Sequence, residues 1–425
     1  MLQRLRSHSL LRGIATIATG TALAQLITFF FTPIITRLYG PEALGTLGIF
    51  NTAVTISSIV ASLALPTAIT LPKTDREAAR ITIASIYASV LICSAQFVTL
   101  AAFGSTLFAS IGSPGLIIYA PLIPISAFLI CISMMATQWL VRTQNHTGNA
   151  RTATVNSFFV NAAKACTGYI SATPTTLIIT HSFGFISNAA LTLIQLRPKL
   201  HDIFSDLRVS PIEEIRIFRD FPIYRMPQNL LNSISQGLPI LLLSALFDIA
   251  KAGQYSIAQA ALLTPSALLG VAITSVFYPH ITKAINDGRS ASNQIKKATI
   301  VLALFSAIPF LIIGFFGQEI FSIVFGREWS QAGIYAQILA PWLFFQLVNK
   351  PAVAALPGLK KQRGLLVYEI ASTALKAASL WIGFSIFDSD IWALILFSGS
   401  GVISYIWLIL WTIQSAQAYE RNKAS

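Results

Sequence analysis

The sequence predicts an all-α integral membrane protein with about twelve transmembrane helices, and three observations lead to this prediction. Hydrophobic residues make up 54% of the 425-residue chain and charged residues only 11%, whereas a soluble protein carries about a quarter. The mean hydropathy is +0.68. The apolar residues gather into long runs with few charges, as in helices that cross a bilayer. These features exclude a soluble domain, a disordered chain, a collagen and a coiled coil.

The apolar runs follow one another along the whole chain, each with about 18 residues or more. In order, they cover 13–36, 46–71, 81–108, 116–141, 152–172, 175–196, 226–247, 254–279, 298–317, 332–356, 365–386 and 391–414. The first run is too long for a cleaved signal peptide, and Arg37 follows it without a small-residue cleavage pattern. A membrane β-barrel is excluded because its strands would alternate apolar and polar residues.

The distribution of basic residues predicts that both ends of the chain lie in the cytoplasm. With the N-terminus inside, cytoplasmic segments hold about 23 of the 29 Lys and Arg residues, and the outer loops hold only Arg37, Lys251 and Arg327. The net charge of +13 is therefore chiefly a signal of topology. Nucleic-acid binding would need a dense basic face, which this sequence lacks.

The longest loop, residues 197–225, lies at the middle of the chain and predicts a linker between two halves. The run Ser210-Pro211-Ile212-Glu213-Glu214 is a capping box with proline at the first helical position, and apolar residues recur every three positions from Ile212 to Phe221. We expect a short amphipathic helix in the inner membrane interface. The predicted organisation is an N-terminal lobe of six spans (1–196), this linker, and a C-terminal lobe of six spans (226–425).

An internal repeat relates the two halves. Shifting residues 151–170 by 212 positions, half the chain length, aligns them with residues 363–382 and matches Lys164 with Lys376. Both copies run from inside to outside, which predicts parallel repeats about an axis along the membrane normal. Chance identity among small apolar residues is the alternative explanation.

Lys164 and Lys376 are charges inside predicted spans, where a cation costs about 2.5–3.5 kcal/mol at the bilayer centre. Lys164 shares a helix face with Ser157, Asn161 and Gly168, and Lys376 shares one with Glu369. Two interpretations are open: the lysines line an aqueous cavity and bind substrate, or they pair across helices and staple the bundle. With Lys350, three lysines face one acid, so a cavity lined by them favours an anion such as pyrophosphate.

Further polar side chains join these candidates. Asn232 and Gln236 give the seventh span a polar face, and Lys350 lies near the inner end of the tenth span. Glu369 is either an ion-coupling site or the counter-ion of Lys350 or Lys376. His181, in the sixth span, is interpreted by default as a packing residue, with proton coupling as the alternative.

The sequence offers no chemistry beyond binding. The nucleotide-binding patterns G-x-x-x-x-G-K-[ST] and G-x-G-x-x-G and the zinc pattern H-E-x-x-H are all absent. Cys93, Cys131 and Cys166 fall within spans without metal-ligand spacing, which indicates core packing. We therefore expect no enzyme, no metal site and no bound cofactor.

Two stretches near the N-terminus carry a family resemblance. T-G-T-A-L-A-Q-L-I-T-F-F-F-T-P-I-I-T-R-L-Y-G-P-E-A-L-G (19–45) resembles the opening of bacterial polysaccharide-export proteins, the Wzx-type flippases of lipid-linked oligosaccharides, and A-I-T-L-P-K-T-D-R-E-A-A (68–79) resembles their first cytoplasmic loop. Beyond the first 80 or so residues the resemblance rests on span number and layout. These exporters belong with the multidrug/oligosaccharidyl-lipid/polysaccharide (MOP) superfamily. The resemblance implies its MATE-like fold of two six-helix lobes around a central cavity.

The resemblance also implies a function. The expected substrate is an undecaprenyl-pyrophosphate-linked oligosaccharide, such as an O-antigen or other surface polysaccharide repeat unit, moved from the inner to the outer leaflet of the bacterial cytoplasmic membrane. Alternating access driven by a proton or sodium gradient is implied, with a polysaccharide polymerase and chain-length proteins as partners. Arg37, which matches the family motif, either binds anionic head groups or anchors its loop against Glu42. The sequence departs from the family at Ala64–Thr67, where a charged run is usual, so a charge role there is lost.

Two other functions compete with this one. A multidrug antiporter of the same superfamily would be expected to carry an intramembrane acid in its N-terminal half, and the first six spans contain none. A membrane-embedded polysaccharide polymerase or ligase would be expected to carry a large outer loop, and every outer loop here has roughly 15 residues or fewer.

Overall fold

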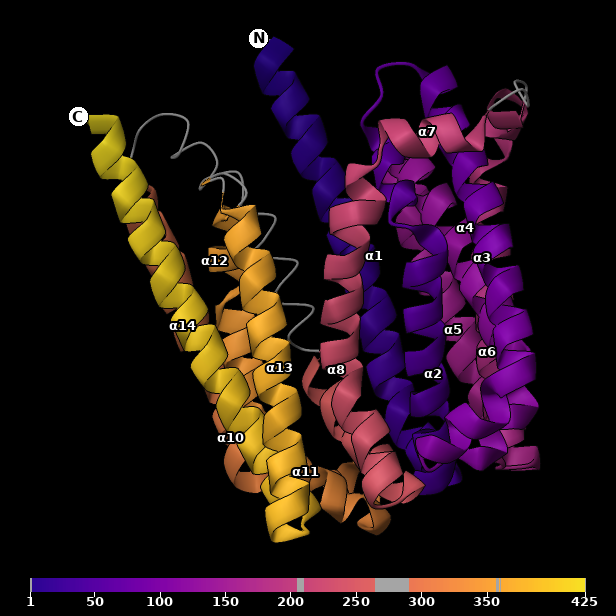
Figure 1. Cartoon of the computed structure of the whole chain (residues 1–425), viewed down its shortest axis with the longest axis vertical. Helices are drawn as coiled ribbons and strands as arrows, with labels where there is room; N and C mark the ends of the chain where they lie inside the picture. The colour runs from indigo at the N-terminus through magenta and orange to yellow at the C-terminus, as the bar shows by residue number, and fades with distance from the viewer. Residues whose placement is uncertain (1, 205–209, 264–289, 357–358, 360, 425) are drawn as a thin grey trace. The chain divides into compact units, whose positions relative to one another are not determined.

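Long helices make up nearly all of the chain in the computed structural model (Figure 1). The structure describes residues 2–204, 210–263, 290–356, 359 and 361–424, and none of these residues lies in a β-strand. The helices pack into two compact units, Met1–Gly253 and Gln254–Ser425, called unit 1 and unit 2 below. The predicted lobe boundary at 197–225 stays a prediction.

The elements of unit 1 follow the predicted spans. They are α1 (Leu2–Leu38), α2 (Pro41–Ser62), η1 (Leu65–Thr70), α3 (Asp75–Ser110), η2 (Pro114–Tyr119), α4 (Leu122–Arg142), α5 (His146–Ile170), α6 (Pro174–Phe204), α7 (Pro211–Ile217), η3 (Phe221–Arg225) and α8 (Met226–Leu246). A further helix is described over residues 249–263.

Unit 2 is built in the same way from long helices with short connections. Its elements are α10 (Ala291–Val324), η4 (Arg327–Trp329), α11 (Ser330–Val348), α12 (Lys350–Ala355), α13 (Gln362–Phe387) and α14 (Asp390–Ala424). In chain order, α11 packs on α10 and α14 packs on α13.

Ten of the described helical segments are long and apolar enough to cross a membrane. The prediction of an all-α membrane protein is therefore confirmed. Of the remaining predicted spans, the fifth (152–172) forms α5, whose many polar residues lower its hydropathy. The eighth (254–279) is helical up to residue 263, and the rest of it lies outside the described residues.

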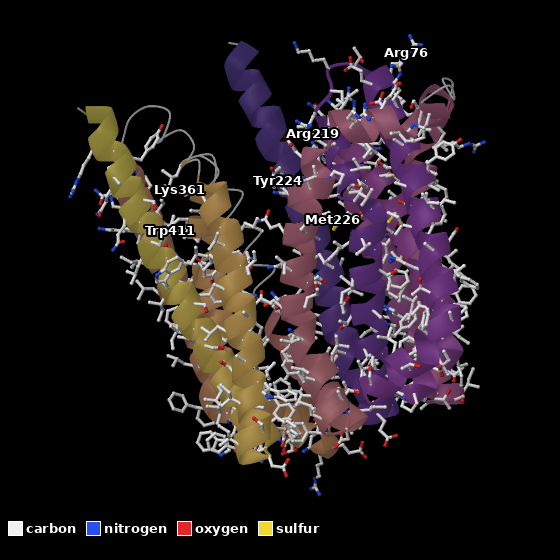
Figure 2. All side chains as sticks on the ribbon, in the orientation of Figure 1. Arg76, Arg219, Tyr224, Met226, Lys361 and Trp411 are labelled. Carbon is white, nitrogen blue, oxygen red and sulfur yellow. The ribbon has the colours of Figure 1, made fainter. Side chains whose placement is uncertain are left out.

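Large apolar side chains cover the outside of both units, which explains the composition. On unit 1, Leu91 and Ile118 are 73% and 74% exposed, and on unit 2, Phe315 is 73% exposed. Side chains of this kind extend outward along the helices in Figure 2. Because such surfaces are favourable only against hydrocarbon, the exposed residues support membrane insertion as strongly as the hydropathy does.

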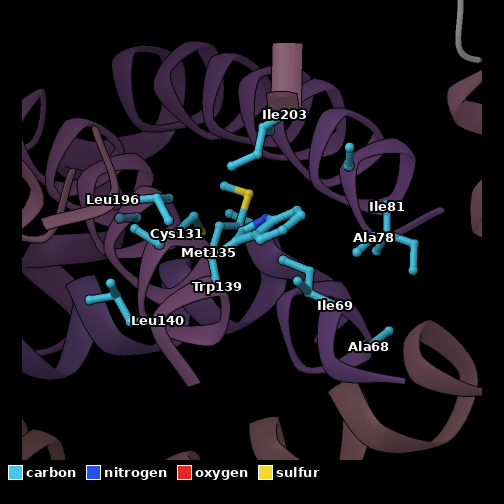
Figure 3. Packing of buried hydrophobic residues seen from close by; sticks show 14 of the residues in the cluster. Ala68, Ile69, Ala78, Ile81, Cys131, Met135, Trp139, Leu140, Leu196 and Ile203 are labelled. Atoms are coloured by element: carbon cyan, nitrogen blue, oxygen red, sulfur yellow. The ribbon is translucent and has the colours of Figure 1, made fainter. Parts of the chain in front are cut away.

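The core of unit 1 at one end of the bundle is a cluster of buried residues from α3, α4, α6 and η1 (Figure 3). Trp139 of α4 is fully buried there, and its indole Nε1–H donates to Thr82 Oγ1 of α3 at 2.8 Å. Cys131 also lies in this cluster, as expected for a packing residue. Arg76 and Arg219 lie at the same end of unit 1 in Figure 2, so bases that the sequence assigns to one side of the membrane share one end of the unit.

The central amphipathic helix is shorter than predicted. α7 ends at Ile217, and a turn and the π-helical η3 follow it before α8. Ser210 lies at the N-cap position with Pro211 after it, but its side chain makes no capping hydrogen bond, so the predicted capping box is wrong. Phe218 and Phe221 pack against the core of unit 1, whereas Ile212 is 73% exposed, because the break after Ile217 divides the predicted apolar stripe.

Arg142, at the end of α4, holds the chain segment that precedes α3. Its Nε–H donates to Asp75 Oδ1 at 2.9 Å, and its guanidinium also donates to the carbonyl oxygens of Ile69 (3.2 Å) and Pro72 (2.7 Å). Lys199 Nζ of α6 lies 3.6 Å from the other Asp75 oxygen. These contacts explain the 68–79 motif structurally, because its residues supply the carbonyls and the acid that one arginine binds.

Arg142→Ala is expected to lower the free energy of unfolding by about 1–3 kcal/mol, because it leaves the Ile69 and Pro72 carbonyls without their donor. Arg142→Lys should recover only part of this loss, because an ammonium lacks the planar fork of a guanidinium. Thermal unfolding of the detergent-solubilised protein measures both effects. An alanine variant as stable as the wild type would show that water replaces the arginine without cost.

Candidate functional site

The polar stripe predicted on the fifth span faces α1. Ser157 Oγ lies 2.9 Å from Thr28 Oγ1 and donates to the Ala24 carbonyl at 2.8 Å. The Asn161 side-chain nitrogen donates to Thr28 Oγ1 at 3.2 Å and to the Ser157 carbonyl at 2.8 Å. Asn161 is only 6% exposed. These two residues therefore hold α5 against α1, and a direct substrate contact by Asn161 stays a prediction.

Lys164 and Gly168 extend the same interface toward the end of α5. The Tyr39 hydroxyl donates to the Lys164 carbonyl at 3.1 Å, and a Cβ on Gly168 would come within 2.7 Å of the Tyr39 ring. Glycine is required at position 168 because the tyrosine ring occupies the space of a side chain. Tyr39 lies within the 19–45 stretch, so this stretch supplies the residue that covers the backbone beside Lys164.

The ammonium of Lys164 is buried without a counter-ion. The residue is 8% exposed, and its Nζ makes no hydrogen bond or ion pair with any residue that the structure describes. α5 begins at His146 and ends at Ile170, so Lys164 lies six residues from its end, roughly 9 Å at 1.5 Å per residue. The sequence places this lysine nearer the middle of its helix. Its burial shows that it does not reach the membrane surface even from this position.

His181 of α6 is a titratable residue on which this lysine acts, and it bonds to a residue that the sequence did not single out. Its Nε2 lies 2.7 Å from Asn51 Oδ1 of α2, and the ring packs edge-on against Phe185 with 5.0 Å between centroids. The charge of Lys164 acts on His181 across the α5–α6 interface. The three residues Lys164, His181 and Asn51 are called the unit 1 cluster below.

The repeat-related Lys376 has different surroundings in unit 2. It is 5% exposed, and its Nζ lies 5.9 Å from the centroid of the Tyr405 ring on α14. Glu369, two turns earlier on α13, acts electrostatically on Lys376. The Tyr405 hydroxyl accepts a hydrogen bond from the Gln346 side chain of α11 at 3.2 Å. Lys376, Glu369, Tyr405 and Gln346 are called the unit 2 cluster below.

The other predicted residues lie apart from both clusters. Lys350 is exposed at the start of α12, and Glu369 acts on Lys376 rather than on Lys350. Arg37 is exposed in the last turn of α1, Asn232 is exposed on α8, and Gln236 is half-buried one turn further along α8. Their roles in binding stay predictions.

No group of three or more His, Cys, Asp or Glu side chains able to hold a metal ion occurs within the described ranges. Cys93 and Cys131 are buried, whereas Cys166 is exposed. The prediction that Cys166 is a core residue is therefore wrong, because it lies on the outer face of α5, opposite the side that packs on α1.

The family described as "polysaccharide biosynthesis protein" matches residues 34–334. The chain belongs to this family. It is 21% identical over 407 residues to the succinoglycan biosynthesis transport protein ExoT of Rhizobium meliloti (strain 1021), a match that covers 92% of this chain and 77% of the relative.

Solved structures confirm the exporter fold for this family member. The lipid II flippase MurJ in an inward closed conformation superposes with a TM-score of 0.75 at 14% identity, covering 96% of this chain and 90% of that one. An inward-facing MATE-family multidrug transporter of the MOP superfamily superposes with a TM-score of 0.74 at 14% identity, covering 93% and 96% of the two chains. The predicted resemblance and fold class are confirmed, and family and fold together support a multi-pass membrane translocase.

Proposed function

We propose that this exporter-family protein moves an undecaprenyl-pyrophosphate-linked oligosaccharide from the inner to the outer leaflet of the bacterial cytoplasmic membrane. The observation that carries this proposal is Lys164, a buried cation of unit 1 that has no counter-ion among the described residues. Family membership and the MurJ-like fold support a translocase for a lipid-linked substrate. No covalent step is needed, because translocation requires only binding and alternating access.

A buried cation without a counter-ion is costly unless a ligand offsets the cost. Removing an ammonium from water costs several kcal/mol, and an ion partner recovers much of this energy. A pyrophosphate brings at least two negative charges and several acceptor oxygens, and lysine binds such groups as a point charge. Because Lys164 is enclosed in this structure, we infer that helices around it must part before an anion reaches it.

Lys376 is the second candidate for the anion, and Glu369 is the candidate for ion coupling. Glu369 already acts on Lys376, so in this state it serves as the counter-ion of that lysine. A proton or sodium ion that neutralised Glu369 would release Lys376 for the substrate, which would couple an ion gradient to binding. Polysaccharide polymerase and chain-length proteins remain the proposed partners.

A multidrug antiporter is the competing function within the fold, since MATE transporters share it. Such a protein would need an anionic site for cationic drugs. In unit 1 the acids Glu42, Asp75 and Glu77 lie in the first turns of α2 and α3, and the titratable groups of the unit 1 cluster are a lysine and a histidine. The charge of this cluster therefore favours an anionic substrate.

The test uses purified protein in proteoliposomes that contain an undecaprenyl-pyrophosphate-linked oligosaccharide. A membrane-impermeant glycosidase reports how much glycan lies in the outer leaflet. We expect the accessible fraction to rise from about half toward completion with the protein, and to stay at half without it. No change in accessibility, together with transport of a cationic dye by the same vesicles, would contradict the proposal and favour the antiporter.

A further inference from the structure

His181 is a half-buried histidine that connects α6 to α2 and α5 in unit 1. Its Nε2 lies 2.7 Å from the side-chain oxygen of Asn51 on α2, and the charge of Lys164 on α5 acts on its ring. Residues 51, 164 and 181 belong to three different helices, which meet at this histidine. Packing alone explains the Phe185 contact but not a hydrogen-bonded imidazole beside a lysine.

The hydrogen bond to Asn51 fixes which ring nitrogen carries the proton. An amide oxygen only accepts, so Nε2 of His181 must donate and therefore carries the hydrogen. The neutral ring then has its lone pair on Nδ1. That atom is buried and has no hydrogen-bond partner among the described residues. Nδ1 is thus the atom at which this histidine can take up a proton.

Burial disfavours the charged form of His181, and the charge of Lys164 adds to this effect. Lys164 is the one charged group of the described chain that acts on it. The other charged groups on the helices packed on α6 lie in the terminal turns of those helices: Glu42 on α2, Asp75, Arg76, Glu77 and Arg80 on α3, Arg142 on α4, and Arg151 on α5. A second positive charge at His181 would be repelled by the Lys164 ammonium inside the membrane.

We propose that His181 takes up a proton on Nδ1 when an anionic pyrophosphate lipid binds at Lys164, so that substrate and proton bind the unit 1 cluster together. This inference rests on the proposed function. The anion removes the repulsion from Lys164, and the new Nδ1–H supplies a second donor for a phosphate oxygen. Because linkage is reciprocal, the anion favours protonation and protonation favours the anion by the same factor.

The experiment measures proton uptake during binding. Undecaprenyl pyrophosphate is titrated into the full chain in nanodiscs by calorimetry, in buffers of different ionisation enthalpy. We expect uptake of close to one proton per bound lipid and affinity that rises by up to about tenfold per unit of falling pH across the histidine range. In His181→Gln, binding should persist more weakly, and this uptake and pH dependence should be lost.

Two variants make the outcome specific. Uptake that persists in His181→Gln would place the proton on Lys164 or on the lipid and overturn the inference. Asn51→Asp should hold His181 protonated in advance, because a carboxylate on Nε2 stabilises the imidazolium. This variant should therefore bind the lipid with little uptake and little pH dependence. Uptake in Asn51→Asp equal to that of the wild type would also overturn the inference.

The failure of this inference differs from the failure of the proposed function. Tight binding of undecaprenyl pyrophosphate without proton uptake would overturn the role of His181 and leave the substrate proposal intact. If the wild type and all variants bind undecaprenyl pyrophosphate no better than they bind an anionic phospholipid, both the inference about His181 and the proposed substrate would be overturned. Elution of each variant as a single species in size-exclusion chromatography identifies the samples that are folded.

Discussion

Lys164→Gln is expected to reduce translocation of the lipid-linked oligosaccharide by at least about tenfold while the protein still folds and inserts. Glutamine is close to lysine in length and polarity but carries no charge, so the change removes the cation and little of the packing. Because Lys164 has no counter-ion among the described residues, its removal leaves no opposite charge buried. Stability should therefore be unchanged or slightly higher, while the attraction for pyrophosphate is lost.

Glycosidase accessibility in proteoliposomes measures this effect, and Lys297→Gln is the matched control. Lys297 is also a lysine on a helix, but it is exposed near the start of α10 and is not a candidate for substrate binding. Its replacement should change translocation by less than about threefold. Lys164→Arg should keep part of the activity, because the charge persists while the larger guanidinium disturbs the buried site. Wild-type translocation by Lys164→Gln would exclude this lysine from substrate binding.

Much of the fold follows from the sequence because hydrocarbon imposes a simple rule on a membrane helix. Long apolar runs must be helical, since no other single segment satisfies its backbone hydrogen bonds in lipid. The ranges predicted for α4 and α13 therefore agree with the structure within several residues, whereas the run predicted over 46–71 covers both α2 and η1. Helix ends are less predictable. α5 begins at His146, six residues before the predicted start, because its first turns are polar and carry no hydropathy signal.

The candidate site was harder to predict, because its contacts join residues far apart in the chain. Spacing along α5 placed Ser157, Asn161 and Lys164 on one face, but it did not show that Thr28 and Tyr39 of α1 cover that face. The sequence gives no reason to select Asn51, since a single asparagine in an apolar run forms no periodic polar face. The histidine within the sixth span is the one feature that points toward Asn51, because an imidazole inside a membrane helix bundle needs a hydrogen-bond partner.

The two lysines of the internal repeat illustrate the same limit. The alignment treats Lys164 and Lys376 as equivalent, yet their surroundings differ in charge. Among the described residues Lys164 has a histidine beside it and no acid that acts on it, whereas Lys376 has Glu369 and the Tyr405 ring. A repeat preserves the backbone position of a residue more readily than its partners. Sequence therefore identifies two candidates, and the structure shows that the charges around them differ.

The second large effect is expected in the unit 2 cluster. There the loss of stability on removing one charge should depend on whether the opposite charge is still present. Lys376→Gln should lower stability by about 0.5–3 kcal/mol, the range for coupled neighbouring groups, because Glu369 acts on this cation. Glu369→Gln should also destabilise, since it removes the acid that acts on the Lys376 ammonium. The double variant, with neither charge, should recover part of the loss, giving a coupling energy of about 1–3 kcal/mol.

Thermal unfolding of the four proteins in one detergent measures this cycle, and the same proteins assayed in proteoliposomes separate stability from function. If Glu369 only neutralises Lys376, the double variant should regain translocation together with stability. If Glu369 also couples an ion gradient, the double variant should regain stability but lose the response to that gradient. Additive losses of stability in the double variant would contradict the pairing itself. Lys164 has no acid among the described residues whose removal could restore the stability of Lys164→Gln. Only Lys376 should therefore show a coupling energy with an acid. This difference tests whether the lysine of unit 1 binds the anion while the lysine of unit 2 is neutralised by its acid.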